Sequence, residues 1–303
     1  MTPACVSALG LTLLLYLAAA LLFQRQFLLR RDHGDRWGHR LLLAGLILHS
    51  VGLGFHFALS GRTPMSSMLI VVSLITVALL AAVLLLERFT GARHLSLVAA
   101  PLAFLALLYA LVMPVRFDAS ESLLLRYPWL GIHVLLTLVG DICFAVAFCG
   151  ALAYVVQGRS LKRGRLNRYL PPLDASAATT WRFAAAGFSL YTLGLVMGVV
   201  WLYGAPGEYL RPRDAKILMA LPTWAVFAAY LYRRGVNRQH GSRLKWLVIA
   251  GFLLALANLL VVRHQFTPQP SAAGQTTMAG PPAAAGRLPG PAPTEDADAL
   301  QEG

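Results

Sequence analysis

Eight long apolar segments, separated by short stretches rich in arginine and lysine, constrain this 303-residue chain more than any other feature. Each segment is close to the roughly 20 residues that a helix needs to cross the hydrocarbon core of a bilayer. Lipid offers no partner to backbone N–H and C=O groups, so a crossing segment must be helical. The sequence therefore predicts an all-α, polytopic membrane bundle of about eight transmembrane helices. The predicted spans are residues 3–23, 40–59, 66–86, 95–115, 129–157, 183–203, 215–232 and 244–262.

Lysine and arginine gather in alternate gaps between these spans. The stretches 24–40, 87–94, 158–182 and 233–245 hold 18 of the 26 Lys and Arg residues. Because cytoplasmic loops of membrane proteins carry an excess of Lys and Arg, this split predicts that the four stretches are cytoplasmic and both termini are outside. The protein is then expected in the inner (plasma) membrane, and its net charge of +13 reflects this topology. A nucleic-acid partner is not expected.

The apolar segments leave no room for a second folded domain. We expect one transmembrane domain over residues 1–266, whose first span is not cleaved because its positive charges follow it. From Thr267 onward the composition turns to Pro, Gly and Ala and ends in acidic residues. Such a composition cannot bury an apolar face, so residues 267–303 are predicted to be a disordered tail.

Several classes of chemistry lack the motifs that they need. No Cys-x-x-Cys pair occurs among Cys5, Cys143 and Cys149, which argues against disulfide exchange and against covalent cofactor attachment through Cys-x-x-Cys-His. Cys143 and Cys149 are interpreted as small packing residues within an apolar helix. No Gly-rich phosphate loop, Gly-x-Ser-x-Gly or His-Glu-x-x-His is present, so a non-enzymatic protein is expected.

Histidines and one carboxylate stand out among the few polar residues of the spans. His133 lies about one turn inside the fifth span from its outer end, and Asp141 lies about 12 Å deeper. His264 ends the eighth span on the same outer side, while His49 and His56 share one face of the second span. A polar group at this depth is a functional candidate unless it faces a partner in the bundle.

Two interpretations of these histidines remain open. Any single one can be an interhelical hydrogen-bond donor, and His264, next to Arg263, can simply mark the membrane surface. Two histidines at the outer ends of different spans also suit the two axial positions of a haem iron. Asp141 can be a proton relay or can pack against a neighbouring Thr such as Thr192. Gly194 and Gly198, four residues apart, predict a close helix contact.

Residues 41–266 resemble the membrane haem-handling family of cytochrome c assembly proteins, of the CcsA, CcmC and HemX type. The resemblance rests on five segments in the same order as in the family. They are LHSVGLGFHFALSGRTPMSS, then WLGIHVLLTLVGDICFAVAFCGALAYVVQGRSLKR with its Trp-x-x-x-His start and Tyr-x-x-Gln end, GFSLYTLGLVMGVVWLYGAPGEY, LPTWAVFAAYLYRR, and the closing RLKWLVIAGFLLALANLLVVRHQF.

The resemblance implies a site for non-covalently bound, b-type haem. His133 and His264 occupy the positions of the two external haem-ligating histidines, and His49 that of a histidine within the membrane. Arg211, Arg213 and Lys216 of the external loop can bind the haem propionates, because guanidinium and ammonium groups suit carboxylates. The implied task is to hold or present haem during cytochrome c biogenesis, with a separate cytochrome c synthase as partner.

The external loop also supports a second hypothesis. Where the family has a Trp-rich motif, this chain has GAPGEYLRPRDAKIL, which keeps Asp214 and Lys216 but contains no Trp. Loss of that aromatic platform favours a scaffold or regulator of haem biosynthesis of the HemX type, which does not itself carry haem. A small-solute transporter is a third class, and the sequence has no pair of broken, repeated spans to support it.

Overall fold

The computed structural model describes residues 3–29, 35–60, 67–90, 95–112, 128–164, 167, 169–204 and 215–260. In this part of the chain eight elements form, and all are α-helices, as the all-α prediction requires. They are α1 (Pro3–Leu29), α2 (Asp35–Ser60), α3 (Met68–Thr90), α4 (Leu95–Val112), α6 (Pro128–Lys162), α7 (Leu173–Gly204), α8 (Ala215–Gly235) and α9 (Ser242–Leu260). The predicted disordered tail, residues 267–303, lies outside the described residues.

Seven of these helices are long and apolar enough to cross a membrane. The exception is α8, which occupies the predicted span 215–232 but is not among the seven. Its middle carries Pro222, Thr223 and Trp224, which are less hydrophobic than the aliphatic residues of the other spans. The prediction of a polytopic helical membrane bundle is therefore confirmed, and α8 is its least apolar member.

The basic stretch 158–182 contains more helix than the sequence predicted. Helix α6 continues to Lys162, and α7 begins at Leu173, ten residues before its predicted start. At 35 residues, α6 is about 52 Å long, well beyond the roughly 30 Å of a hydrocarbon core. Hydropathy marks only the lipid-facing part of a helix, because a helix in water needs no apolar side chains. We call the helix ends that adjoin the four Lys- and Arg-rich stretches the basic ends.

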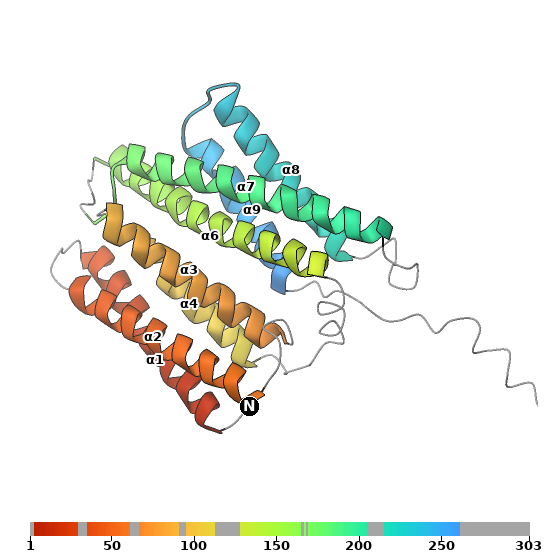
Figure 1. Cartoon of the computed structure of the whole chain (residues 1–303). Helices are drawn as coiled ribbons and strands as arrows, with labels where there is room; N and C mark the ends of the chain where they lie inside the picture. The colour runs from red at the N-terminus through yellow and green to blue at the C-terminus, as the bar shows by residue number, and fades with distance from the viewer. Residues whose placement is uncertain are drawn as a thin grey trace, which may run out of the picture. The chain divides into compact units, whose positions relative to one another are not determined.

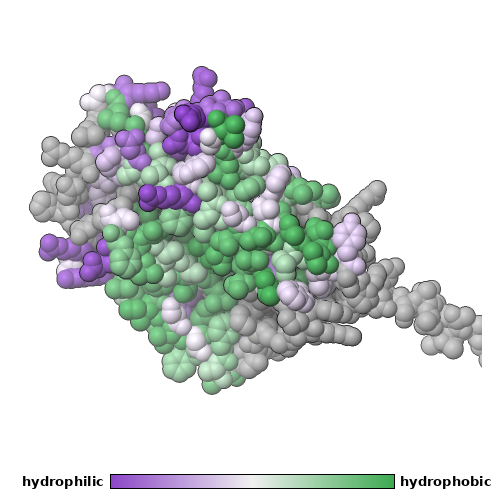
Figure 2. All heavy atoms as spheres, turned by 45° about the horizontal axis from the view of Figure 1, so that its top comes forward, coloured by the Kyte–Doolittle hydropathy of each residue, from purple (hydrophilic) through white to green (hydrophobic). Residues whose placement is uncertain are grey.

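Figure 1 shows the helices as two sets, which we call the first helix group (α1–α4) and the second helix group (α6–α9). In the first group α1 packs on α2 and α4, and α3 packs on α4. In the second group α6 packs on α7 and α9, and α8 packs on α9. Helix α6 also contacts α3 and α4 and so joins the groups. Figure 2 shows hydrophobic side chains across the middle of one face and hydrophilic ones gathered along its upper and left parts.

Glycines bring aromatic rings into the interior of each group. In the first group Gly38 and Gly45 of α2 face Phe23 and Tyr16 of α1, and a Cβ at Gly45 would lie 2.7 Å from the Tyr16 ring. In the second group the rings of Phe144 (α6) and Phe227 (α8) stack at 3.6 Å between centroids. Glycines on α7 and α9 lie against these two rings, so all four helices of the second group meet there.

Candidate functional site

His133 is held against α7 by a hydrogen bond to the backbone. Its Nδ1 lies 2.6 Å from the carbonyl oxygen of Gly194, one of the closest interhelical polar contacts in the described chain. A carbonyl oxygen can only accept, so Nδ1 carries the proton and the lone pair of the neutral imidazole is on Nε2. This arrangement fixes both the tautomer of His133 and the orientation of its ring.

Gly194 and Gly198 make room for this contact. A Cβ at Gly198 would lie 2.8 Å from Nδ1 and Cε1 of His133, and a Cβ at Gly194 would lie 2.6 Å from Cγ2 of Thr137. The predicted close helix contact at these two glycines is confirmed. The sequence did not indicate that His133 itself is the group that fills the space beside them.

The other residues predicted for the outer site are not all described. His264, Arg211 and Arg213 lie outside the described residues. Lys216 lies in the first turn of α8, but the placement of its side chain is outside the described part. The convergence of His264 and the basic loop residues on His133 therefore stays a prediction.

His49 is the most deeply enclosed histidine of the described chain. Its side chain is fully buried, and its Nδ1 lies 3.2 Å from the hydroxyl oxygen of Tyr16 on α1. Its Nε2 has no hydrogen-bond partner among the described residues. His56, two turns further along α2, is also buried, which confirms that this face of the helix points inward. His49 thus presents a buried nitrogen to the interior of the first helix group.

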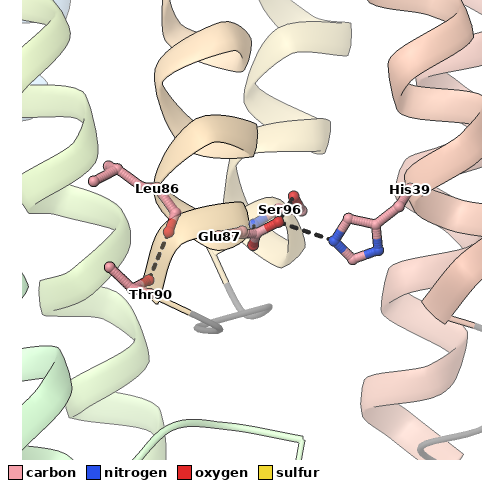
Figure 3. A network of polar contacts seen from close by, with 5 residues as sticks. All are labelled: His39, Leu86, Glu87, Thr90 and Ser96. Atoms are coloured by element: carbon pink, nitrogen blue, oxygen red, sulfur yellow. Dashed lines mark hydrogen bonds and ion pairs between the residues drawn. The ribbon is translucent and has the colours of Figure 1, made fainter.

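A polar network at the basic ends of the first helix group was not predicted. Figure 3 shows the carboxylate of Glu87, at the end of α3, between Ser96 of α4 and His39 of α2. The backbone N–H and the hydroxyl of Ser96 donate to Glu87 at 2.7 and 2.6 Å, and Nε2 of His39 lies 2.9 Å from the same carboxylate. The network therefore joins three helices and satisfies a backbone donor in the first turn of α4.

Comparison with known proteins identifies the family of this bundle. The family model described as "Cytochrome C assembly protein" matches residues 39–267, about three quarters of the chain. The chain belongs to this family. It is 28% identical to the cytochrome c biogenesis protein CcsA of Synechococcus elongatus over 247 residues, covering 66% of this chain and 76% of that protein.

Two further relatives carry the same name. The CcsA protein of Prochlorococcus marinus strain AS9601 is 26% identical over 285 residues, which cover 85% of this chain and 91% of the relative. The CcsA protein of Guillardia theta is 26% identical over 238 residues, with 72% and 79% covered. The assembly-protein match contains His49 and His133 and begins after α1 ends.

The Tyr-x-x-Gln end of α6, part of the assembly-protein resemblance, meets a buried lysine. Lys245 of α9 is only 2% exposed, and its ammonium nitrogen lies 5.2 Å from the ring centroid of Tyr154 and 5.6 Å from that of Tyr230. The same nitrogen lies 3.5 Å from the hydroxyl oxygen of Tyr230. Cation–π attraction stabilises an ammonium in such a place. This contact was not predicted, because in the sequence Lys245 is one of several basic residues beside a span.

Asp141 lies in a second polar cluster of the assembly-protein core. It is half-buried on α6 and electrostatically close to Tyr191 of α7, whose hydroxyl meets the side chains of Thr223 and Asn258. Thr192, the partner suggested by the sequence, donates to the carbonyl of Phe188 and accepts from Nε1 of Trp224. The packing of Asp141 against Thr192 stays a prediction, and Tyr191, the residue before Thr192, is a group close to Asp141 that the sequence analysis did not name.

Proposed function

We propose that this assembly-family protein binds haem at the outer side of the membrane and presents it during cytochrome c biogenesis. The axial ligands in this proposal are His133 and His264. Support comes from the family match and from the name of the relatives, "Cytochrome c biogenesis protein CcsA". Haem would supply an iron atom with axial positions for two imidazole nitrogens.

The observation that carries the proposal is the hydrogen bond from Nδ1 of His133 to the carbonyl of Gly194. Metal-ligating histidines usually donate their second ring N–H to a carbonyl or carboxylate, which orients the ring and raises the basicity of the coordinating nitrogen. The tautomer present here has its lone pair on Nε2. His133 therefore fits the role of an axial ligand.

His49 is proposed as a second haem-contacting residue, inside the membrane. Its fully buried Nε2 lacks a partner among the described residues, and an unpaired polar atom in this environment is costly. At 1.5 Å per residue, His49 lies about 16 Å from the end of α2 at Ser60, whereas His133 lies about 8 Å from the start of α6. His49 would thus contact haem deeper in the membrane than the outer pair.

The remaining parts of the proposal concern charge and partners. Arg211, Arg213 and Lys216 would neutralise the haem carboxylates, since a dianionic group at a membrane boundary needs compensation. The haem would be b-type and non-covalently bound. The protein would act without catalysing a reaction, and a separate cytochrome c synthase would receive the haem.

We also propose an orientation, with the basic ends in the cytoplasm and both termini outside the inner (plasma) membrane. Single-cysteine variants at Ser160 and Ser271, in a chain freed of its three cysteines, test it with an impermeant thiol reagent on intact cells. Labelling at position 271 alone is expected. Labelling at position 160 but not at 271 would reverse the orientation.

The visible spectrum of the protein purified in mild detergent tests the haem proposal. We expect a Soret band and visible bands that sharpen on reduction, and His133→Ala should weaken or shift them because one axial bond is lost. The matched control is His240→Ala, which removes an exposed histidine beyond the basic end of α8. A colourless wild-type preparation that also fails to take up added haemin would contradict the proposal.

That negative result would favour the scaffold hypothesis. The specific observation behind it is the external loop GAPGEYLRPRDAKIL, which contains no tryptophan to cover a porphyrin face. Under this hypothesis the protein regulates haem biosynthesis through partner proteins, as a membrane scaffold of the HemX type. Substitution of His133 would then alter only the contact between α6 and α7.

A further inference from the structure

The buried pair of Tyr16 and His49 links α1 to α2 in the interior of the first helix group. Neither side chain is exposed, and the phenol oxygen lies 3.2 Å from Nδ1 of the imidazole. The two rings are 5.9 Å apart and tilted by 58°, so they do not stack. The hydrogen bond is therefore the specific contact that relates the two side chains.

The backbone of α2 fixes where this phenol lies. Gly45 is four residues before His49, one turn away on the same face of the helix. A Cβ at Gly45 would lie 2.7 and 2.8 Å from two carbons of the Tyr16 ring, so the ring rests directly on the backbone of α2. The ring rests on one turn of α2, and its hydroxyl reaches the imidazole on the next turn.

The two ring nitrogens of His49 have different surroundings. Nδ1 faces the Tyr16 hydroxyl, while Nε2 is buried without a hydrogen-bond partner among the described residues. If Nδ1 carries the proton and donates it to the phenol oxygen, the lone pair of Nε2 is directed into the interior. This is the tautomer that binds a metal through Nε2, and the donated hydrogen bond makes that nitrogen a stronger ligand.

We infer that Tyr16 is the positioning residue of His49, holding it as the Nδ1–H tautomer so that Nε2 can bind the iron of haem inside the membrane. This inference rests on the proposed function for its ligand. It assigns a role to α1, which lies wholly outside the matched residues 39–267. Helix α1, which lies outside the matched residues, would then complete a site whose histidine, His49, lies within them.

The first test needs no haem. Protein labelled with ¹⁵N-histidine in detergent reports the tautomer of each histidine through its ring nitrogen shifts, and loss of a signal in His49→Gln identifies His49. We expect the Nδ1–H tautomer in the wild type. In Tyr16→Phe the ring packing is kept but the acceptor is gone, so the Nε2–H tautomer should become the major form.

Tyr109→Phe is the matched control, because the Tyr109 hydroxyl also makes one interhelical hydrogen bond, 2.5 Å to the carbonyl of Leu260. It should leave the His49 signals unchanged. An Nε2–H tautomer in the wild type, or identical His49 signals in wild type and Tyr16→Phe, would overturn the positioning role.

The second test asks whether this positioning serves haem. In a His133→Ala background the remaining haem uptake reports the interior site, and Tyr16→Phe should weaken it about tenfold, the effect typical of losing a hydrogen-bond partner of a metal-ligating histidine. Tyr109→Phe should not weaken it. Equal haem affinity with and without Tyr16 would overturn the inference, whereas a wild type that takes up no haem would overturn the proposed function and leave the tautomer result standing.

Discussion

The two helix groups hold their inner histidines in different ways. In the first group the partners of histidine are other side chains: Tyr16 for His49, and Glu87 for His39. In the second group His133 bonds to a backbone carbonyl, and glycines clear the space for its ring. A side-chain partner is lost by one polar-to-apolar substitution, while a backbone partner is lost only when something displaces the ring. The groups should therefore respond to opposite kinds of mutation.

The largest effect is expected at Glu87 in the first group. Glu87→Ala leaves the buried N–H and hydroxyl of Ser96 without their acceptor, and His39 without its ion pair. Each buried donor left unsatisfied costs about 1 kcal/mol or more, so the free energy of unfolding should fall by about 3 kcal/mol. Titration with SDS, followed by tryptophan fluorescence, measures it.

Glu87→Gln is the matched control for this prediction. It keeps one of the two oxygens that accept hydrogen bonds from Ser96, and it loses the other oxygen together with the charge that faces His39, so its loss of stability should be smaller than that of Glu87→Ala. Equal losses in the two variants would mean that the negative charge of the carboxylate, and not an acceptor for Ser96, makes Glu87 important, because Gln keeps the volume and one acceptor oxygen of Glu.

The next largest effect should come from adding one methyl group in the second helix group. In Gly194→Ala the new Cβ would meet Cγ2 of Thr137 at 2.6 Å and the Thr137 backbone nitrogen at 3.1 Å. Because the backbone cannot yield as a side chain can, we expect a loss of about 2 kcal/mol in the free energy of unfolding. Gly131→Ala on α6, whose Cβ would meet nothing within 4 Å, should cause no loss. Similar stabilities for the two variants would mean that the second helix group does not depend on the space left by Gly194, and would contradict the difference between the groups.

Gly198→Ala should act on the His133 ring more than on stability. The added Cβ would lie 2.8 Å from two atoms of the imidazole, so the ring must turn away and lengthen its bond to Gly194. If His133 binds haem, the affinity of the Gly198→Ala protein for haem should be about tenfold lower than that of the wild type, which corresponds to about 1.4 kcal/mol. Haemin titration monitored at the Soret band measures this change, with Gly131→Ala again as the control. Unchanged affinity would mean that the orientation of the His133 ring does not affect haem binding.

The sequence predicted the helices well and their contacts only in part. Each of the eight helices of the described residues matches a predicted apolar segment, because lipid requires a crossing segment to be apolar over a definite length. Their basic ends were misplaced, and Glu87 was assigned to a loop, because the apolar stretch ends at Leu86 while the helix continues to Thr90. Hydropathy carries no information about the helix that extends past the lipid.

Contacts between helices were predictable only where a short sequence pattern within one helix indicated them. The Gly194–Gly198 spacing indicated a close contact, because missing side chains are visible in the sequence. Tyr16 and His49 are 33 residues apart in the sequence, and their pairing depends on the register between α1 and α2. Neither segment contains a pattern from which that register can be predicted. His133 was predicted from its depth and its motif, but its carbonyl partner on α7 was not, since every residue has a carbonyl.

The smallest effect is expected at the hydrogen bond from Nε1 of Trp224 to the Thr192 hydroxyl, which lies in the second helix group at 3.0 Å. This side-chain pair is half-exposed on the surface of the bundle, unlike the buried partners of the first group. Thr192 also donates to the carbonyl of Phe188, so a single substitution would mix two bonds. A double-mutant cycle of Trp224→Phe and Thr192→Val isolates the pair, and its coupling energy should be about 0.6 kcal/mol, the average for such bonds within membranes. A coupling as large as the effect of Glu87→Ala would show that side-chain partners stabilise both groups equally, and the distinction between the two groups would fail.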